Sequence, residues 1–443
     1  MPVKYSFIIP TLNEELYLDA ALESLKCFRN YEIIISDGGS EDNTLQIAAK
    51  YHAKIVKSPP GRGSQLNNGI EKAQGEVLCF LHADTLLPDN AFTLLEDYFQ
   101  KSENKICRFK LGFDVDHKIL NGYKKFSIYD TIFTRFGDMF IAIRKDFVND
   151  IGRFPNWELF EDVEFLRKAA KKSKIFVLDE EVISSARTFT KYGLISQQLY
   201  NIRLFIKYFA GAKRFIENGK YYTREMKKKT ASIILFVKYP AEGKVKTRLA
   251  KSIGNPKAAK IYTALAEHVV KKMKRLKNSY NYIFYSDESE KEKIKKWIRG
   301  NFFYAPQKGD DLGERMSNAF KLVFGHSAEK VLIIGTDIPD LSTKIINDAI
   351  KKLDYYDVVI GPSPDGGYYL LGMKKFTPKL FENITYSTNT VFEDTIQRIK
   401  DGNLSYHILE TIEDIDTEDE LRNWLDGSDE TQLKNEISKI YRE

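Results

Sequence analysis

Short apolar segments alternate with helix-like segments in the first part of the chain, and this alternation constrains the fold more than any other feature. The apolar runs have the length of buried strands and cover residues 5–9, 32–36, 54–57 and 76–81. Stretches with helical spacing lie between them, at residues 15–26, 43–51 and 64–73. Strands that alternate with helices of this length predict βαβ units and a parallel sheet covered on both faces.

The same rhythm returns in the second half, after a less regular region at residues 105–186 and a polar, basic run at 222–230. The strand candidates there are residues 232–237, 282–285, 302–304, 331–335, 358–360 and 368–373, and the helix candidates are 257–274, 312–324 and 343–353. A chain of 443 residues exceeds one ordinary core and suits two domains. We therefore expect two tandem α/β domains with mostly parallel sheets, at residues 1–225 and 231–443.

Charge and cysteine content narrow the classes of function. The chain has 68 basic and 62 acidic residues, and this mild excess of basic residues forms no concentrated stripe. The balance argues against nucleic-acid binding and suits small anionic substrates such as nucleotide diphosphates. The three cysteines match neither a zinc knuckle nor a disulfide framework, which indicates a reducing compartment. Because neither a signal-peptide pattern nor a long apolar run is evident, we expect a cytoplasmic protein.

A basic amphipathic segment at residues 196–216 leaves open whether the protein lies on a membrane surface. Its apolar side chains alternate with Arg203, Lys207, Lys213 and Arg214 in a helical pattern. Such a helix either lies on the anionic inner face of a membrane or packs on its domain with a solvated basic face.

Four polar motifs follow predicted strands or helices of the first half, where open α/β sheets bind ligands. Their candidate residues are Pro10, Thr11, Asn13 and Glu14 after the first strand, Asp37 and Gly38 after the second, His82 and Asp84 after the strand at 76–81, and Glu161 and Asp162 farther along. Alone, the Asp37 motif is equally typical of a turn and helix cap, Asp84 is equally typical of a cap, and the pair of Glu161 and Asp162 is more typical of a solvated helix face. Their ordered combination favours a functional site.

The chemistry of a sugar nucleotide explains these residue types. The charge of its leaving diphosphate is neutralised by a divalent cation, Mn²⁺ or Mg²⁺, held by one or two carboxylates. Asp84 suits that role, with His82 beside it as a ligand for Mn²⁺. Asp37 can accept hydrogen bonds from base or ribose, and Arg62 can pair with phosphate. A carboxylate on the opposite side of the sugar can serve as the general base for an acceptor hydroxyl.

The ordered motifs resemble those of the family 2 glycosyltransferases of the GT-A fold. PTLNE at 10–14 is similar to their opening motif, and SDGGSEDNT at 36–44 to their uracil-and-ribose motif. GRGSQLNNGIEKAQGEVLCFLHADT at 61–85 resembles the segment that ends in an Asp-x-Asp-type metal motif. GDMFIAIRKDFVNDIGRFP at 137–155, followed by ELFEDVEF at 158–165, resembles the acceptor-side segment.

This resemblance covers residues 3–215 and implies an inverting transfer from a nucleotide diphospho-sugar to an acceptor. It casts Asp162 as the base and Asp84 as the metal ligand, because His82 stands where the family has its first aspartate. It also implies that Arg187, in the basic motif Ser-Ala-Arg, contacts the diphosphate. The chain is most similar to a subgroup of transferases associated with radical-SAM proteins and selenodomains.

Basic and acidic motifs also follow the predicted strands of the second half. The loop after 232–237 carries Lys238, Lys244, Lys246 and Arg248, and basic side chains at a strand-to-helix turn suit phosphate, although a solvated loop is the alternative. Asp337 and Asp365 each follow a later strand and could share one divalent cation. We interpret Asp311 as a helix cap, and residues 414–417 as a cap of the final helix rather than a binding segment.

The second-half motifs are similar to GT-A-like proteins distantly related to molybdenum-cofactor and phospholactate nucleotidyltransferases. The similarity covers residues 231–425 and rests on KVKTRL, DLGERM, GTDIPDL and GPSPDGGYYLLG, with Tyr386 where tryptophan is usual. It adds Glu314 and Arg315 to the candidate ligand-binding residues. A bifunctional enzyme follows as the first hypothesis: the second domain activates a phosphate with a nucleoside triphosphate, and the first transfers the product. The alternatives are two sequential glycosyltransferases, or a second domain that only binds.

Overall fold

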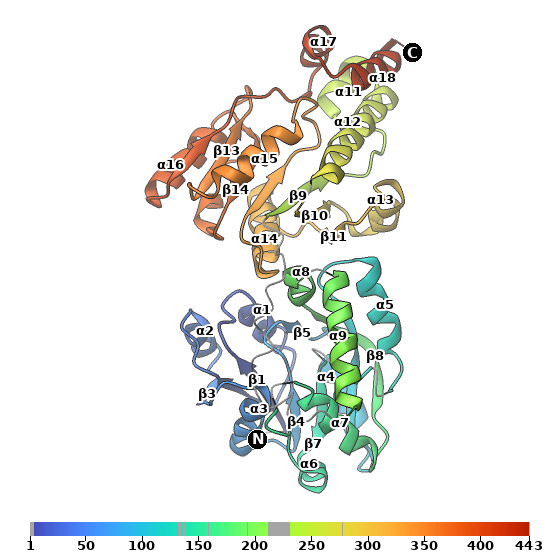
Figure 1. Ribbon diagram of the computed structural model, residues 1–443, viewed down its shortest axis with the longest axis vertical. Coiled ribbons are helices and arrows are strands. Elements are labelled where there is room, and N and C mark those ends of the chain that lie inside the picture. The colour runs from blue at the N-terminus through green and yellow to red at the C-terminus, as the bar shows by residue number, and fades with distance from the viewer. Residues whose placement is uncertain are drawn as a thin grey trace. The chain divides into compact units, whose positions relative to one another are not determined.

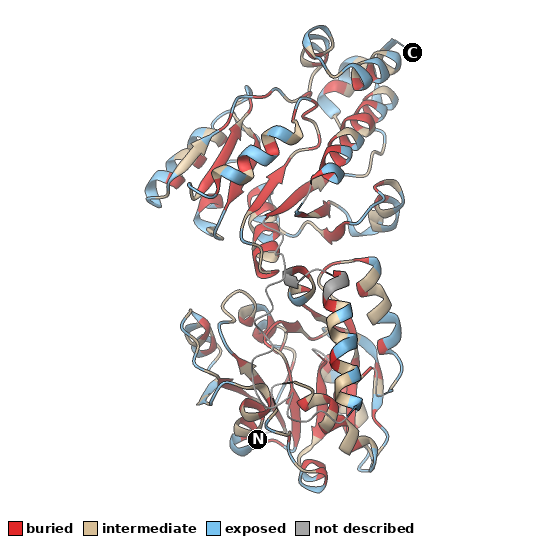
Figure 2. Cartoon of the chain, viewed as in Figure 1, coloured by how far each residue is buried: buried red, intermediate tan, exposed pale blue. Residues whose placement is uncertain are grey.

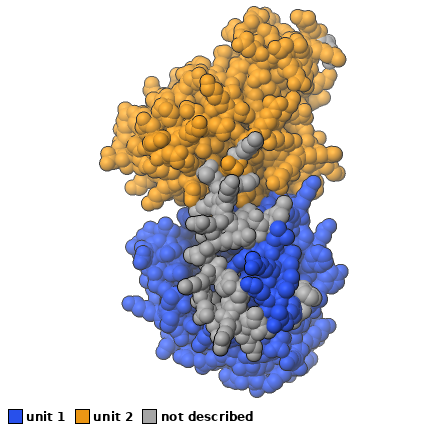
Figure 3. Space-filling view, in the orientation of Figure 1, with its two compact units in different colours: residues 1–226 blue, residues 227–443 orange. Residues whose placement is uncertain are grey.

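The structure is a computed structural model that describes residues 4–131, 134–135, 139–157, 159–192, 194–210, 231–276 and 278–442 (Figure 1). The chain divides into two compact units, residues 1–226 and 227–443 (Figure 3). The segment at 222–230, where the sequence predicts the boundary, lies outside the described residues. Within the described part of the chain, no helix combines the length and apolar character needed to cross a membrane.

The first unit is built on an eight-stranded sheet in the order β3-β2-β1-β4-β7-β6-β8-β5. Its strands are β1 (Tyr5–Thr11), β2 (Tyr31–Asp37), β3 (Lys54–Lys57), β4 (Val77–Phe80), β5 (Thr85–Leu86), β6 (Ile106–Phe113), β7 (Ile141–Arg144) and β8 (Phe176–Ser184). The strands from β3 to β4 are parallel, β7 runs antiparallel to both its neighbours, and β6 and β8 are parallel. The expected parallel core is therefore confirmed for the segment that alternates most regularly in the sequence.

The helices of the first unit follow the strands closely. They are α1 (Leu18–Glu23), α2 (Thr44–Lys50), α3 (Arg62–Lys72), α4 (Ala91–Phe99), α5 (Lys118–Ser127), α6 (Lys145–Ile151), α7 (Glu161–Ala170), α8 (Arg187–Tyr192) and α9 (Leu194–Phe209). Of the predicted helix at 196–216, residues up to 210 are described, and α9 covers most of them.

Alternate side chains of β1 enter two separate cores, as expected for a strand that is covered on both faces. Phe7 and Ile9 join the cluster that contains Leu18 and Leu95, whereas Ile8 joins the cluster that contains Leu66. In Figure 2 the inner strands of the sheet are coloured as buried. Burial of both faces fixes the register of the central strand, so the loops at its carboxyl end are held in place.

The second unit is built on a seven-stranded sheet in the order β11-β10-β9-β12-β14-β13-β15. Its strands are β9 (Ala231–Val237), β10 (Ser279–Tyr285), β11 (Phe303–Pro306), β12 (Val331–Ile334), β13 (Val358–Pro362), β14 (Tyr368–Met373) and β15 (Tyr406–Ile408). Its helices are α11 (Thr247–Ile253), α12 (Asn255–Arg275), α13 (Lys291–Trp297), α14 (Leu312–Gly325), α15 (Thr343–Lys352), α16 (Val391–Asp401), α17 (Glu418–Gly427) and α18 (Thr431–Arg442), with 3₁₀ turns at Glu288–Glu290 and Pro378–Phe381.

Position by position, the two sheets have the same strand order and the same directions, apart from the extra β5. The one internal antiparallel strand is β7 in the first sheet and β14 in the second. The strand beyond it is parallel to its outer neighbour in both, as β6 is to β8 and β13 to β15. Each loop of one unit therefore has a topological counterpart in the other, which allows their sites to be compared.

Candidate active site

The loop after β2 is organised around the carboxylate of Asp37. This buried side chain accepts four hydrogen bonds: from the Thr11 and Ser40 hydroxyls at 3.0 and 2.5 Å, and from the amides of Gly39 and Ser40 at 2.9 Å. Burial alone would raise the pKa of Asp37, but these hydrogen bonds outweigh it and hold the pKa below its ordinary value. Asp37 is thus an ionised group that fixes the shape of its loop.

A second set of polar contacts joins the loop after β1 to the loop after β2. Asn13 lies in the left-handed region with φ of 56°, and its side-chain oxygen accepts the amide of Glu41 at 2.8 Å. Gln65 of α3, a residue that we did not select from the sequence, donates to the carbonyls of Thr11 and Ser36, both at 2.8 Å. A buried amide that cross-links two strand ends gives no recognisable sequence signal, because its partners are backbone atoms.

Arg187 connects three strand ends of the first unit through its guanidinium group. Two of its nitrogens form a bidentate pair with Glu14, at 2.7 and 2.8 Å, and its Nε lies 2.8 Å from an oxygen of Asp84. The guanidinium also lies over the ring of Tyr17, 5.0 Å from its centroid. The sequence selected all three charged residues as ligand-binding groups, and the structure brings them into one ion-pair cluster.

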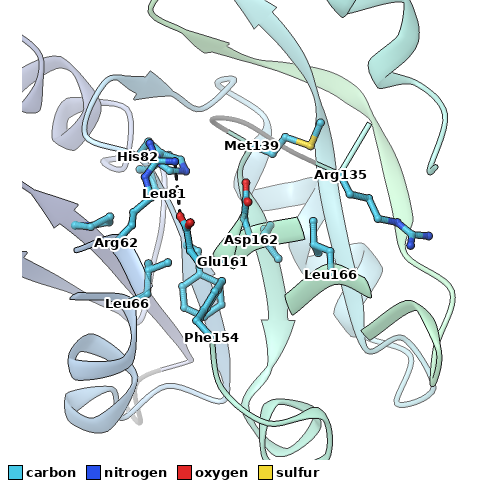
Figure 4. Close-up of a pocket in the computed structure, with 13 residues that line it drawn as sticks. Arg62, Leu66, Leu81, His82, Arg135, Met139, Phe154, Glu161, Asp162 and Leu166 are labelled. Atoms are coloured by element: carbon cyan, nitrogen blue, oxygen red, sulfur yellow. Dashed lines mark ion pairs between the residues drawn. The ribbon is translucent and has the colours of Figure 1, made fainter. Parts of the chain in front are cut away.

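A small cavity of ≈ 20 Å³ lies at the start of α7, and His82, two residues before Asp84, belongs to its lining (Figure 4). Its lining includes Pro10, Arg62, His82, Glu161 and Asp162, all of which the sequence had selected. In Figure 4 the buried Glu161 carboxylate points toward Arg62 and His82. Arg62 lies 3.8 Å from it. The backbone before Glu161 turns through the left-handed region, with φ of 62° at residue 160, and the two acidic residues that follow this turn both line the cavity.

The second unit gathers charge at the matching end of its sheet, around Lys246. This lysine also lies in the left-handed region, with φ of 46°, and its buried Nζ donates to Asp337 at 2.9 Å and to Asp416 at 2.7 Å. Oxygens of Asp337, Asp414 and Asp416 lie within 4.8 Å of one another. Burial, with Asp337 and other carboxylates nearby, raises the pKa of Asp414 to about 7.

Our interpretation of residues 414–417 as a cap holds only for Thr417. Its hydroxyl and the Glu420 carboxylate form a capping box at the start of α17. Asp414 and Asp416 instead join the carboxylate group of Asp337. This grouping could not be predicted from the sequence, because β12 and residues 414–416 are far apart in the chain. Asp365, expected to share a cation with Asp337, is not in the group; its carboxylate accepts the Ser363 hydroxyl and the Gly367 amide.

Other candidates in the second unit have local structural contacts. Asp311 caps α14, as predicted, by accepting the amide of Glu314 at 2.8 Å. Glu314 accepts the Asp310 amide, and Arg315 donates to the carbonyl of Gly309 at 2.9 Å, so both residues fasten the preceding loop. The remaining basic candidates, Lys238, Lys244 and Arg248, are exposed around Lys246. Arg248 lies 3.7 Å from Asp416.

Two family models match parts of the chain. Residues 6–148 match the model for Glycosyl transferase family 2. Residues 269–388 match DUF2064, a group described as uncharacterized and conserved in bacteria. These matches assign a family 2 glycosyltransferase segment to the first unit and a DUF2064 segment to the second. Together with the strand order, they show that the chain has the α/β fold of nucleotide-diphospho-sugar transferases, with two sheets in tandem.

Individual relatives match about half of the chain. The minor teichoic acid biosynthesis protein GgaB of Bacillus subtilis is 26% identical over 45% of this chain and 23% of its own length. An uncharacterized glycosyltransferase of Haemophilus influenzae is 25% identical over 54% of this chain and 96% of its own. A Desulfovibrio desulfuricans structure assigned to the nucleotide-diphospho-sugar transferases is 33% identical, with a TM-score of 0.44 and coverage of 48% and 97%. The chain spans between 23% and 37% of three of the curated relatives it matches.

Proposed function

Starting from a first unit that contains a family 2 glycosyltransferase segment, we propose that this unit transfers a sugar from a nucleotide diphospho-sugar to an acceptor with inversion. One observation carries the proposal: the motif residues converge on one cavity and one ion-pair cluster, although they come from five separate parts of the chain. A helix cap or a solvated helix face would not require that convergence.

Each group has a role in this reaction. Asp162 lines the cavity from the first turn of α7 and acts as the general base for the acceptor hydroxyl. Glu161, buried beside Arg62, holds that arginine at the rim, where a guanidinium can pair with phosphate. The guanidinium of Arg187 would exchange its ion pair with Glu14 for one with the diphosphate. The loop that Asp37 holds in place would bind the base and ribose.

A divalent cation fits the donor atoms at the end of β4. Asp84 offers carboxylate oxygens and His82 an imidazole nitrogen, the donors that Mn²⁺ accepts, and Mg²⁺ favours the oxygens. The cation would neutralise charge on the leaving diphosphate. Because Arg187 already contacts one oxygen of Asp84, cation binding would change this ion pair. Titration of the protein with Mn²⁺, followed by electron paramagnetic resonance, tests this directly, and Asp84→Asn should weaken binding.

For the second unit we propose activation of a sugar phosphate, or a related phosphate, by a nucleoside triphosphate. The support is the arrangement of Lys246 between Asp337 and Asp416, since nucleotidyl transfer needs a cation at the phosphates and carboxylates for a divalent metal. Similarity to molybdenum-cofactor and phospholactate nucleotidyltransferases, and of the first unit to radical-SAM-associated transferases, also motivates this pairing. The substitution Asp337→Asn should abolish pyrophosphate release, whereas Asp348→Asn on the exposed face of α15 should not.

The first test supplies the full chain with a panel of nucleotide diphospho-sugars and acceptors and measures nucleoside diphosphate release. We expect Asp162→Asn to lower kcat by roughly 10²–10⁴-fold, the contribution of a positioned base, with KM little changed. Asp146→Asn is the matched control, because Asp146 is also the second residue of a helix and, like Asp162, accepts the next amide at 2.7 Å. Equal activity of the two variants would exclude Asp162 as the base.

The products separate the proposal from its alternatives. Pyrophosphate release that depends on Asp337 supports activation followed by transfer. Nucleoside diphosphate release that depends on Asp337 would instead make the second unit a second glycosyltransferase. If Asp337→Asn alters neither product, the second unit is a binding module.

A further inference from the structure

The first unit carries an apolar face on α5 and α9 that its own core does not use. Along α9, large side chains recur at helical spacing on the outside: Leu199 and Ile206 are each 64% exposed, Ile202 is 53% exposed and Phe209 is 51% exposed. Phe126 at the end of α5 is 66% exposed. Exposed apolar residues that occur singly need no explanation, but a continuous stripe marks an interaction surface.

A groove of ≈ 930 Å³ runs between the two helices and extends this face inward. Apolar side chains that include Ile119, Phe126 and Phe205 line it, together with the polar side chains of Tyr123, Thr131, Thr134, Gln198 and Asn201. Tyr123 of α5 hydrogen-bonds Asn201 and Gln198 of α9 across the groove. The hydroxyls of Thr131 and Thr134 also lie 3.1 Å apart, so these polar groups bond one another, and the surface that the groove offers a ligand is mainly apolar.

The charges on these helices have one sign. Lys118, Lys124, Lys125, Arg203 and Lys207 lie on α5 and α9, and neither helix contains an aspartate or glutamate. Among the neighbouring acids, Glu181 pairs with Lys124 at 2.7 Å.

Within α9, Arg203 and Lys207 stand four residues apart, a like-charge spacing that disfavours an isolated helix. Desolvation, together with repulsion from Arg203, lowers the pKa of Lys207. A fold that keeps two cations at this spacing beside an apolar stripe is complementary to an anionic partner.

We propose that the face formed by α5 and α9 docks on an anionic phospholipid bilayer. The stripe of α9 would enter the boundary between headgroups and acyl chains, and the flanking cations would meet the phosphates. A second copy of the chain is a poorer occupant, because its cations would oppose those of the first. A small apolar ligand could fill the groove but would leave the exposed ridge and its cations without a partner. The proposal does not depend on the transferase reaction.

Vesicle flotation of the full chain, without any nucleotide, tests this proposal. We expect binding to vesicles of mixed phosphatidylglycerol and phosphatidylcholine, little binding to phosphatidylcholine alone, and release by salt. The double variant Arg203→Gln/Lys207→Gln should bind about 25-fold more weakly, because each charge near an anionic surface contributes about fivefold. Ile202→Ser/Ile206→Ser should weaken binding at least tenfold, because burial of even one such apolar side chain contributes about tenfold or more to binding.

The control variant is Ile55→Ser, on the edge strand β3, where the isoleucine is 40% exposed and outside the proposed face. It should float like the wild type, and thermal melts should show that every variant folds. Lys207→Gln alone provides a milder test if a double variant does not fold.

Equal binding to neutral vesicles, absence of binding, or variants that bind like the wild type would overturn the proposal. So would self-association without lipid that Ile202→Ser/Ile206→Ser abolishes, since a second copy would then cover the face.

Discussion

Replacement of Arg187 by methionine should destabilise the first unit strongly, because it leaves two buried carboxylates without their counter-charge. Arg187 forms a bidentate pair with Glu14 and a third contact with Asp84. The side chains of these partners are only 11% and 3% exposed. Water therefore cannot replace the lost guanidinium, and the two negative charges repel each other across the gap that remains.

The expected magnitude follows from the burial of the partners. Removal of one member of a buried ion pair costs about 3–5 kcal/mol, a large fraction of the ~5–15 kcal/mol that stabilises a typical domain. Since Arg187 itself is 30% exposed, we expect the lower end, about 3 kcal/mol. The triple variant Arg187→Met/Glu14→Gln/Asp84→Asn removes all three charges and should recover most of this loss, because no unpaired charge remains.

Hydrogen exchange in increasing urea, followed by mass spectrometry, measures the loss for peptides of β1 and β4 separately from those of the second unit. The matched control is Arg153→Met. Arg153 also pairs with a glutamate, Glu71 at 2.6 Å, but both side chains are about half exposed. Its loss should cost less than about 1 kcal/mol. If Arg187→Met is no more destabilising than this control, or if the triple variant is as unstable as the single one, the reasoning from buried charge is wrong.

Three further predictions concern local features. Burial raises the pKa of Asp414 from 3.8 to about 7, so between these pH values the folded second unit binds a proton that the unfolded chain does not. The melting temperature of the second unit should therefore fall as pH rises through this window, and this pH dependence should be absent in Asp414→Asn. In Gly69→Ala, the new Cβ would overlap the Ile8 Cγ2 methyl and push α3 from β1, which should cost about 1–3 kcal/mol in urea unfolding. Thr417→Ala removes the capping box of α17 and should cost about 1 kcal/mol, whereas Thr431→Ala, at the first residue of α18, should cost less.

The sequence predicted the parallel core well because its inner strands β1, β2 and β4 carry buried apolar side chains on both faces. The strands from β1 to β4 were all expected, with ends within a few residues of the observed ones. The strands β6 and β8 were not. Residues 176–184 of β8 include six exposed or half-buried positions, three of them charged, so the apolar pattern that marks a buried strand is absent there. Only pairing with β6 and β5 makes this segment a strand.

The candidate residues of the first unit were identified more completely than their contacts. Ordered motifs at strand ends pointed to Glu14, Asp84 and Arg187, but not to their mutual ion pairs, because residue 187 lies far along the chain from the other two. In the second unit, the same long separation concealed Asp414 and Asp416, whose local sequence is equally typical of a helix cap. Local patterns predict which residues are chemically capable, and topology decides which of them meet.

The matching strand orders of the two units limit how their loops could be exchanged. In the first unit, the strands at positions β1 and β4 are followed by the acids Glu14 and Asp84, and the segment after β8 supplies the cation Arg187. The second unit reverses this: its cation follows β9, and acids follow both β12 and β15.

A swap of only the segments after β8 and β15 would leave the first cluster with four carboxylates and no cation, and the second with two cations and one carboxylate. Recombination between the halves would therefore have to move the loops after the first and last strands together. The charge balance of each cluster therefore requires these two loops to be inherited together, although they are distant in the chain.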